Sequence, residues 1–70
     1  MIRLCKRNEQ KGTVIICRFF PGVGFYMKDY YDKWGRLTDQ SQVFFEAGKL
    51  ENTVSSLIRR GYVQINNVDP

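Results

Sequence analysis

Aromatic and basic side chains alternate over one short segment of this 70-residue chain. Tyr26, Lys28 and Tyr30 are spaced two residues apart, so on a β-strand they project to the same side. Rings interleaved with a cation are typical of nucleic-acid platforms, where rings stack on bases and cations neutralise phosphates. A solvated sheet face is the other interpretation of this pattern. Arginines on the same face would favour nucleic-acid binding, and the candidates are Arg3, Arg7 and Arg18.

The only tryptophan stands in a second basic segment, Lys33-Trp34-Gly35-Arg36. A large aromatic residue on a turn either folds back over the sheet as a small second core or forms a contact surface. The flanking Lys33 and Arg36 make the segment cationic, which suits phosphates or an acidic protein. Both interpretations of Trp34 remain open at this point.

Enzymatic chemistry has few candidate residues. The chain has no histidine, which removes the usual general base near neutral pH and the histidine-activated nucleophiles. Asp29 and Asp32 are three residues apart and would point to opposite faces of a strand, so they are poor partners for acid–base catalysis. Two cysteines without histidine cannot complete a tetrahedral zinc site. We therefore expect a protein that is not an enzyme and that uses neither metal nor cofactor.

The two cysteines, Cys5 and Cys17, differ in their surroundings. Cys17 lies in an apolar run, which predicts a small buried side chain rather than a reactive thiol. Cys5 stands among basic residues that could lower the pKa of its thiol. No neighbouring residue indicates a redox partner for either one.

The positive charge of the chain is unevenly distributed. Eleven Lys and Arg against seven Asp and Glu give a net charge of +4, and the excess lies in residues 1–18. A second basic point, Arg59-Arg60, is most simply a helix-end and solubility feature. This balance favours polyanionic partners, although the same charge also serves solubility. Short apolar runs and a charged N-terminal segment predict no membrane span and no signal peptide, hence a cytoplasmic, intracellular protein.

The spacing of apolar residues predicts the elements that position these side chains. Alternating or β-branched runs predict strands, and Gly, Pro, Asn and Asp predict the turns between them. In the turns, Pro21-Gly22 suits a type II turn and Asp32 to Gly35 suits a bulged hairpin. The predicted strands are residues 2–7, 13–20, 24–31, 36–45 and 62–65.

The apolar spacing changes to a helical period near the C-terminus. Leu50, Val54, Leu57 and Ile58 form one stripe of a helix over about residues 49–60, and Gly61 is placed to end it. The fold class is therefore α+β, with the order β-β-β-β-α-β and one domain over residues 1–70. We expect a single antiparallel sheet with the helix packed on it.

The turn and the helix together resemble the WGR domain. The matching residues are Tyr30 to Leu37, which include Trp34-Gly35-Arg36, and the helix that ends in Gly61-Tyr62. That family occurs in poly(ADP-ribose) polymerases and as small stand-alone bacterial proteins. The resemblance covers about residues 13–65 and implies DNA binding, with Trp34 and Arg36 near a DNA end. The chain departs from the family at Leu37-Thr38-Asp39, where a further glycine is usual.

The leading hypothesis is a nucleic-acid-binding module for DNA or RNA. Phosphate contacts are assigned to basic residues and stacking to the aromatic ones. The alternative is a small protein–protein interaction module, such as a phage-type inhibitor of a host enzyme or nucleoprotein complex. A homodimer joined through residues 2–7 or 62–66 is a third possibility. The candidate nucleic-acid-binding residues are Trp34, Arg36, Lys33, Tyr26, Lys28, Tyr30, Arg3 and Arg18.

Overall fold

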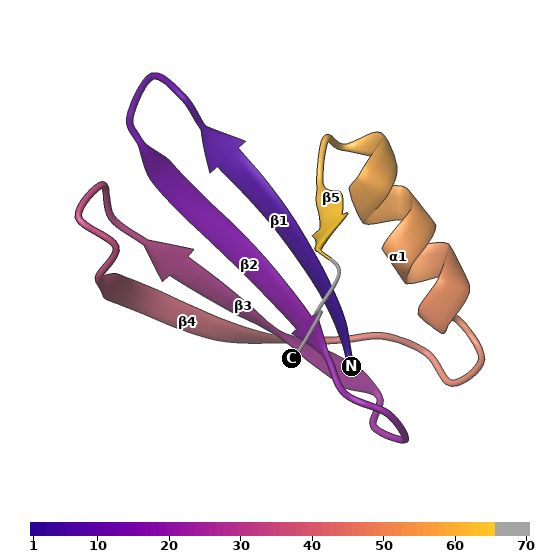
Figure 1. Ribbon diagram of the computed structural model, residues 1–70. Coiled ribbons are helices and arrows are strands. Elements are labelled where there is room, and N and C mark those ends of the chain that lie inside the picture. Colours follow the sequence, from indigo (N-terminus) through magenta and orange to yellow (C-terminus); the bar gives the residue numbers. More distant parts are fainter. Residues whose placement is uncertain (66–70) are drawn as a thin grey trace, which may run out of the picture.

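Five strands form one antiparallel sheet in the computed structural model, which describes residues 1–65 (Figure 1). The fold class and the predicted order of elements are confirmed, with bounds that agree to within one residue. The spatial order of the strands is β4-β3-β2-β1-β5. The elements are β1 (Ile2–Asn8), β2 (Thr13–Phe19), β3 (Phe25–Tyr31), β4 (Leu37–Phe44), α1 (Leu50–Arg59) and β5 (Val63–Ile65).

The strand order places β1 inside the sheet. It pairs with β2 along its whole length and with β5 through residues 3–5, where Leu4 lies opposite both Cys17 and Gln64. The expectation that residues 2–7 form an edge for dimerisation is therefore wrong, because the short β5 takes that edge after the helix returns the chain. The outer strands are β4 and β5.

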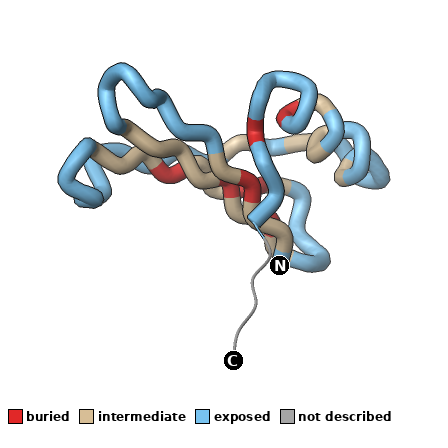
Figure 2. The backbone as a smooth tube through the Cα atoms, turned by 45° about the horizontal axis from the view of Figure 1, so that its top comes forward, coloured by how far each residue is buried: buried red, intermediate tan, exposed pale blue. Residues whose placement is uncertain are grey.

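A small apolar core lies on one side of the sheet, which we call the core face. On this face Phe19 lies opposite Tyr26, and their rings stack with centroids 4.5 Å apart. Leu57 of α1 belongs to the same buried cluster, and Leu50 and Val54 contact it. In Figure 2 the exposed segments include the turns that join β1 to β2 and β3 to β4. The cluster consists of Leu4, Cys17, Phe19, Tyr26, Leu57 and Tyr62.

The C-terminal end of α1 forms a Schellman motif. The Tyr62 N–H donates to the Leu57 carbonyl at 3.1 Å, and the Gly61 N–H donates to the Ile58 carbonyl at 3.0 Å. Gly61 has φ +100°, a conformation that glycine adopts without steric cost. The predicted cap is confirmed, and it directs Tyr62 into the core before β5 begins. At the N-terminal end no side chain caps the helix.

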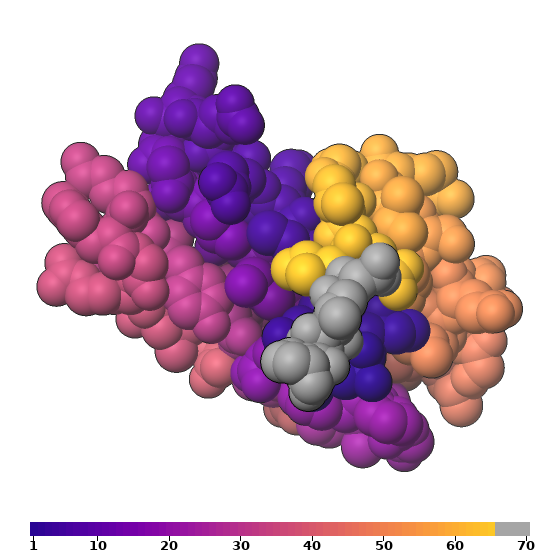
Figure 3. All heavy atoms as spheres, viewed as in Figure 1, coloured from indigo at the N-terminus to yellow at the C-terminus, as the bar shows by residue number. Residues whose placement is uncertain are grey.

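No helix within residues 1–65 is long and apolar enough to cross a membrane. The ends of the β1–β2 and β3–β4 hairpins project away from α1 as two lobes (Figure 3). Gly12 and Lys33 bring these two ends close together, since a Cβ atom added to Gly12 would lie 3.1 Å from the Lys33 Cβ.

Candidate nucleic-acid interface

The turn between β3 and β4 is built around the carboxylate of Asp32. Its Oδ1 accepts the backbone N–H groups of Trp34 and Arg36, each at 2.9 Å. Gly35 has φ +80° and donates to the Asp32 carbonyl at 3.0 Å. The backbone N–H of Arg36, assisted by that of Trp34, lowers the pKa of the Asp32 carboxyl. These bonds hold the turn in one conformation, as the Asp32-to-Gly35 pattern predicts.

Trp34 is exposed at this turn, with 69% of its surface accessible. The interpretation in which it folds back over the sheet is therefore wrong. Its ring lies beside two cations: Lys33 Nζ is 4.7 Å and Arg36 Cζ is 5.4 Å from the ring centroid. Both distances fall within the range of cation–π attraction. The turn thus presents an indole ring and two cationic side chains to solvent, and Arg36 Nε also lies 3.4 Å from Asp32 Oδ2 in an ion pair.

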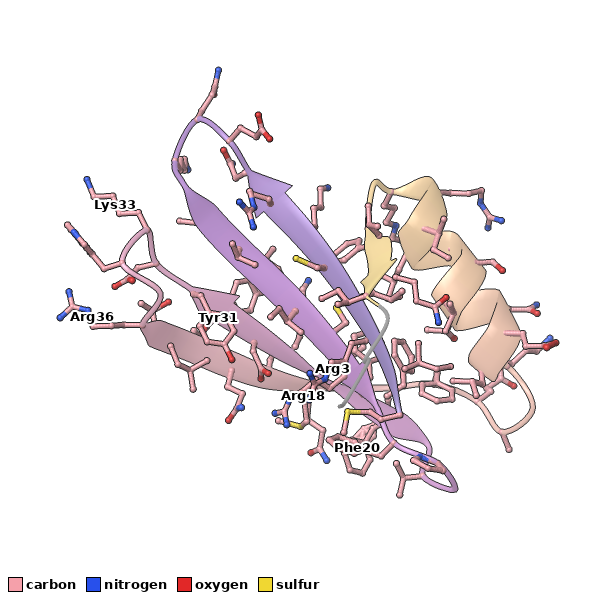
Figure 4. All side chains as sticks on the ribbon, viewed as in Figure 1. Arg3, Arg18, Phe20, Tyr31, Lys33 and Arg36 are labelled. Atoms are coloured by element: carbon pink, nitrogen blue, oxygen red, sulfur yellow. The ribbon has the colours of Figure 1, made fainter. Side chains whose placement is uncertain are left out.

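The side of the sheet opposite the core carries the arginines of the first two strands. Arg3 lies directly opposite Arg18 in the β1–β2 register, and Arg7 lies four residues further along β1, opposite Val14. Figure 4 shows Arg3 and Arg18 together, with Lys33 and Arg36 at the hairpin end. We call this side the arginine face, and it includes Arg3, Cys5, Arg7, Val14, Ile16, Arg18, Asp29, Tyr31 and Gln40.

A buried carboxylate fixes one of the two opposed arginines. Asp29 is 2% exposed, and Arg18 donates to it through Nε at 2.6 Å and Nη2 at 3.2 Å. The Gln40 side-chain amide donates to Asp29 Oδ1 at 2.8 Å. Like charges directly opposite on neighbouring strands repel, and Asp29 offsets this repulsion at Arg18. The guanidinium is thereby held in place near the end of the central strand, β2.

Two hollows meet on the arginine face. One of about 390 Å³ is lined by Arg3 and Arg18 among others, and one of about 590 Å³ is lined by Arg7 and Lys33 among others. Ile16 and Tyr31 line both hollows, so the two form one trough that leads from the hairpin ends to the arginine pair. Four basic residues, Arg3, Arg7, Arg18 and Lys33, line this trough together with the acidic residues Glu9, Asp29 and Asp32. The exposed Trp34 turn stands at its end.

The predicted platform Tyr26, Lys28 and Tyr30 lies on the core face instead. Tyr26 is buried, and this burial raises the pKa of its hydroxyl. Lys28 Nζ lies 5.5 Å from the Tyr30 ring centroid, and the Tyr30 hydroxyl raises the pKa of the Lys28 ammonium. The arginines do not share this face, and Tyr26 is withdrawn from any surface on which a base could stack.

Sequence reasoning named Arg7 as a possible companion of Arg3 and Arg18 but did not include it among the final candidate residues, and it did not select Tyr31 or Gln40. The alternation Arg3-x-Cys5-x-Arg7 places Arg7 with Arg3 on any strand, so this signal was present. Placing Tyr31 and Gln40 on this face requires knowledge of how β3 pairs with β2 and β4. That register cannot be read from the alternation within a single strand.

The two cysteines lie on opposite faces of the sheet. Both thiols are free. Burial raises the pKa of Cys17 to about 11, which confirms the expectation of a buried, unreactive side chain. Cys5 is half-buried on the arginine face. Within residues 1–65, no three His, Cys, Asp or Glu side chains are grouped so that they could hold a metal ion.

Comparisons with protein families, with curated proteins and with solved structures find nothing that matches this chain.

Proposed function

We propose that this protein is a non-enzymatic nucleic-acid-binding module whose contact surface is the arginine face together with the Trp34 turn. We further propose that α1 covers the core face, so that only the opposite side of the sheet is offered to a ligand. Leu57 in the buried cluster supports this arrangement. The observation that carries the proposal is Trp34, 69% exposed between two cations at the end of a trough lined by four basic residues and three acidic ones.

In this proposal the phosphate backbone follows the trough. Arg7 and Lys33 line its wider part, and Arg3 and Arg18 line its narrower part. Neutralisation of phosphates by these side chains supplies most of the affinity and little sequence specificity. Arg36 lies outside the trough, beside the Trp34 ring, where it serves the phosphate next to a stacked base.

Trp34 supplies the stacking contact, which suits a single strand or a duplex end better than the interior of a duplex. An exposed base or terminal pair offers a π-face, whereas paired bases inside a helix do not. A base that stacks on the indole displaces one of the two cations toward the adjoining phosphate. Tyr26, Lys28 and Tyr30 take no part in this contact. The resemblance to the WGR domain stays a prediction.

Salt-dependent binding of a labelled oligonucleotide tests the proposal. We expect micromolar or tighter binding of single-stranded DNA or RNA at low salt, lost as salt rises, with quenching of Trp34 fluorescence. An absence of binding at low salt would overturn the proposal. The same titration with blunt and single-stranded ends distinguishes an end-binding protein from one that follows a strand.

Matched charge variants locate the contact. Arg36→Gln and Arg59→Gln each remove one positive charge from an exposed side chain, but only Arg36 belongs to the proposed surface. We expect Arg36→Gln to reduce the slope of log affinity against log salt by about 1, as for one lost phosphate contact. Arg59→Gln should leave the slope nearly unchanged. Equal effects of the two variants would mean that binding depends on net charge alone.

The alternative of a protein–protein interaction module is separated by capture from a lysate treated with nuclease. The nucleic-acid proposal expects all captured material to be lost after nuclease or high salt. A defined protein partner that survives both treatments would favour the alternative.

A further inference from the structure

The outer strand β4 lacks the features that usually prevent one sheet edge from joining another. Natural edge strands are protected by lysine, proline, bulges or short length. Residues 37–44 contain no Lys, Arg or Pro and only one charged residue, Asp39. The β-bulge in its pairing with β3 lies near the start, opposite Tyr30 and Tyr31. The remaining residues, Asp39 to Phe44, form a regular and mostly exposed edge.

A backbone hydrogen bond just after the end of β4 shows which backbone groups of this strand point away from the sheet. The Phe45 N–H donates to the Gly24 carbonyl at 3.0 Å, so position 45 faces β3. Backbone groups of an antiparallel strand alternate in direction between successive residues. Over the regular part of β4, the N–H and C=O groups of Gln40, Gln42 and Phe44 therefore point away from the sheet, whereas Thr38 lies at the bulge.

Two exposed apolar side chains stand near the two ends of this edge. Leu37 is 50% exposed and Phe44 is 66% exposed. Leu37 lies opposite Tyr31, and Phe44 lies opposite Phe25, with the Phe25 and Phe44 ring centroids 5.8 Å apart. Phe25 and Tyr31 are four and two residues from Asp29 along β3, so all three share the arginine face. Leu37 and Phe44, which lie opposite Tyr31 and Phe25, are therefore on the arginine face too.

We propose that β4 pairs antiparallel with β4 of a second copy, about a two-fold axis through Ser41. The axis is perpendicular to the sheet, so residues that lie opposite each other must point to the same face. This holds only if the axis lies between one residue and the same residue of the second copy, rather than between two successive residues. With Ser41 at the centre, Gln40 lies opposite Gln42 of the second copy and Thr38 lies opposite its Phe44. Gln40 and Gln42 of each copy then form two hydrogen-bonded pairs, giving about four backbone hydrogen bonds.

This register also covers the exposed apolar side chains. Phe44 of each copy lies across from Thr38 and beside Leu37 of the other, so both ends of the edge are buried at once. A centre at Gln40 would instead oppose Phe44 with Arg36 and leave the ring outside the paired strands. The Ser41-centred dimer is one ten-stranded sheet whose two arginine faces point to the same side.

Cysteine cross-linking tests the register. In a Cys5→Ser background, Ser41→Cys places two thiols directly opposite each other in a non-hydrogen-bonded pair, about 4.5 Å between Cα atoms, within the range of a disulfide. Gln42→Cys, one residue away, places its two copies diagonally, beyond about 7 Å and out of reach. We expect mild oxidation to link Ser41→Cys and not Gln42→Cys. Equal cross-linking of the two variants, or none by Ser41→Cys, overturns the proposal.

Solution mass tests the dimer independently. We expect sedimentation equilibrium to give twice the 8.2 kDa of one chain, and Gln42→Pro to give a single chain. Proline at position 42 removes an outward N–H and leaves the bonds to β3 intact. Gln42→Thr, which keeps the N–H, should remain dimeric, and circular dichroism checks that both variants fold. A wild-type mass of one chain at every concentration overturns the proposal.

Discussion

The guanidinium of Arg18 on β2 binds the carboxylate of Asp29 on β3 through two hydrogen bonds, Nε to Oδ2 at 2.6 Å and Nη2 to Oδ1 at 3.2 Å. Asp29 is almost fully buried, whereas the Arg18 side chain is 29% exposed. The pair therefore joins a structural anion to a cation that still reaches solvent. Because the pair joins β2 to β3 on the arginine face, it contributes both to the fold and to the proposed contact surface.

Asp29→Asn is expected to destabilise the fold by roughly 2–4 kcal/mol. The substitution removes the negative charge to which Arg18 and Gln40 both donate hydrogen bonds. It leaves the guanidinium incompletely paired in a partly buried position. Urea unfolding measures the change. Asp39→Asn is the matched control, since Asp39 is exposed on β4 and should change stability by less than about 0.5 kcal/mol. Similar losses in both variants would contradict the structural role of the pair.

Trp34→Ala is expected to weaken nucleic-acid binding by about 5- to 150-fold without changing stability. Stacking of one base on an aromatic side chain contributes about 1–3 kcal/mol, and an exposed ring adds little to folding. Fluorescence anisotropy of a labelled oligonucleotide measures the affinity. Trp34→Phe should retain part of it, because phenylalanine keeps a smaller ring. Unchanged affinity in Trp34→Ala would remove stacking from the proposed mechanism.

Gly35→Ala is expected to destabilise the turn by about 1–2 kcal/mol. The position has φ +80°, and no atom lies within 4 Å of an added Cβ, so the cost is backbone strain alone. Thermal unfolding measures it, and Gly35→Asn should lose less because asparagine tolerates this conformation. Gly24→Ala is the control, since its φ is not positive and its Cβ would make an ordinary 3.6 Å contact with the Phe45 carbonyl oxygen.

Stability is expected to fall above about pH 9, and Cys17 is one cause. Its pKa rises from 9.0 in the unfolded reference to about 11 in the fold, because burial disfavours the thiolate. Between these values the unfolded chain loses the proton first, so each pH unit removes at most about 1.4 kcal/mol. Below pH 9 this contribution is constant.

Urea unfolding of wild type and Cys17→Ala at about pH 8 and about pH 10.5 isolates the effect of Cys17. The variant should be less stable at both values but lose less between them. It should still lose some stability, because burial also raises the pKa of Tyr26 and Tyr62. Parallel pH profiles for the two proteins would contradict a role for Cys17.

Local features were predictable where residue type and backbone conformation act together. The Asp32 carboxylate accepts backbone hydrogen bonds and Gly35 adopts a positive φ, and together they determine the turn. Gly61 ends the helix because it also adopts a positive φ. The alternation of β1 places Arg3 and Arg7 on one face in any sheet. The edge of the sheet was not predictable, because β5 reaches β1 only after the helix reverses the chain.

The sequence by itself determined which side chains share a face in β1, β2 and β3, where the chain turns, and that Trp34 stands between two cations; in β4 the bulge near Thr38 changes the alternation. Only the tertiary structure decided which face is buried and which residues meet across strands. Both faces of β3 carry aromatic residues. Its alternation therefore shows that Tyr26 and Tyr31 point to opposite faces but not which of the two faces the core. The stacking of Tyr26 on Phe19 makes that choice. It turns Asp29 and Tyr31 to the opposite side, where Asp29 meets Arg18.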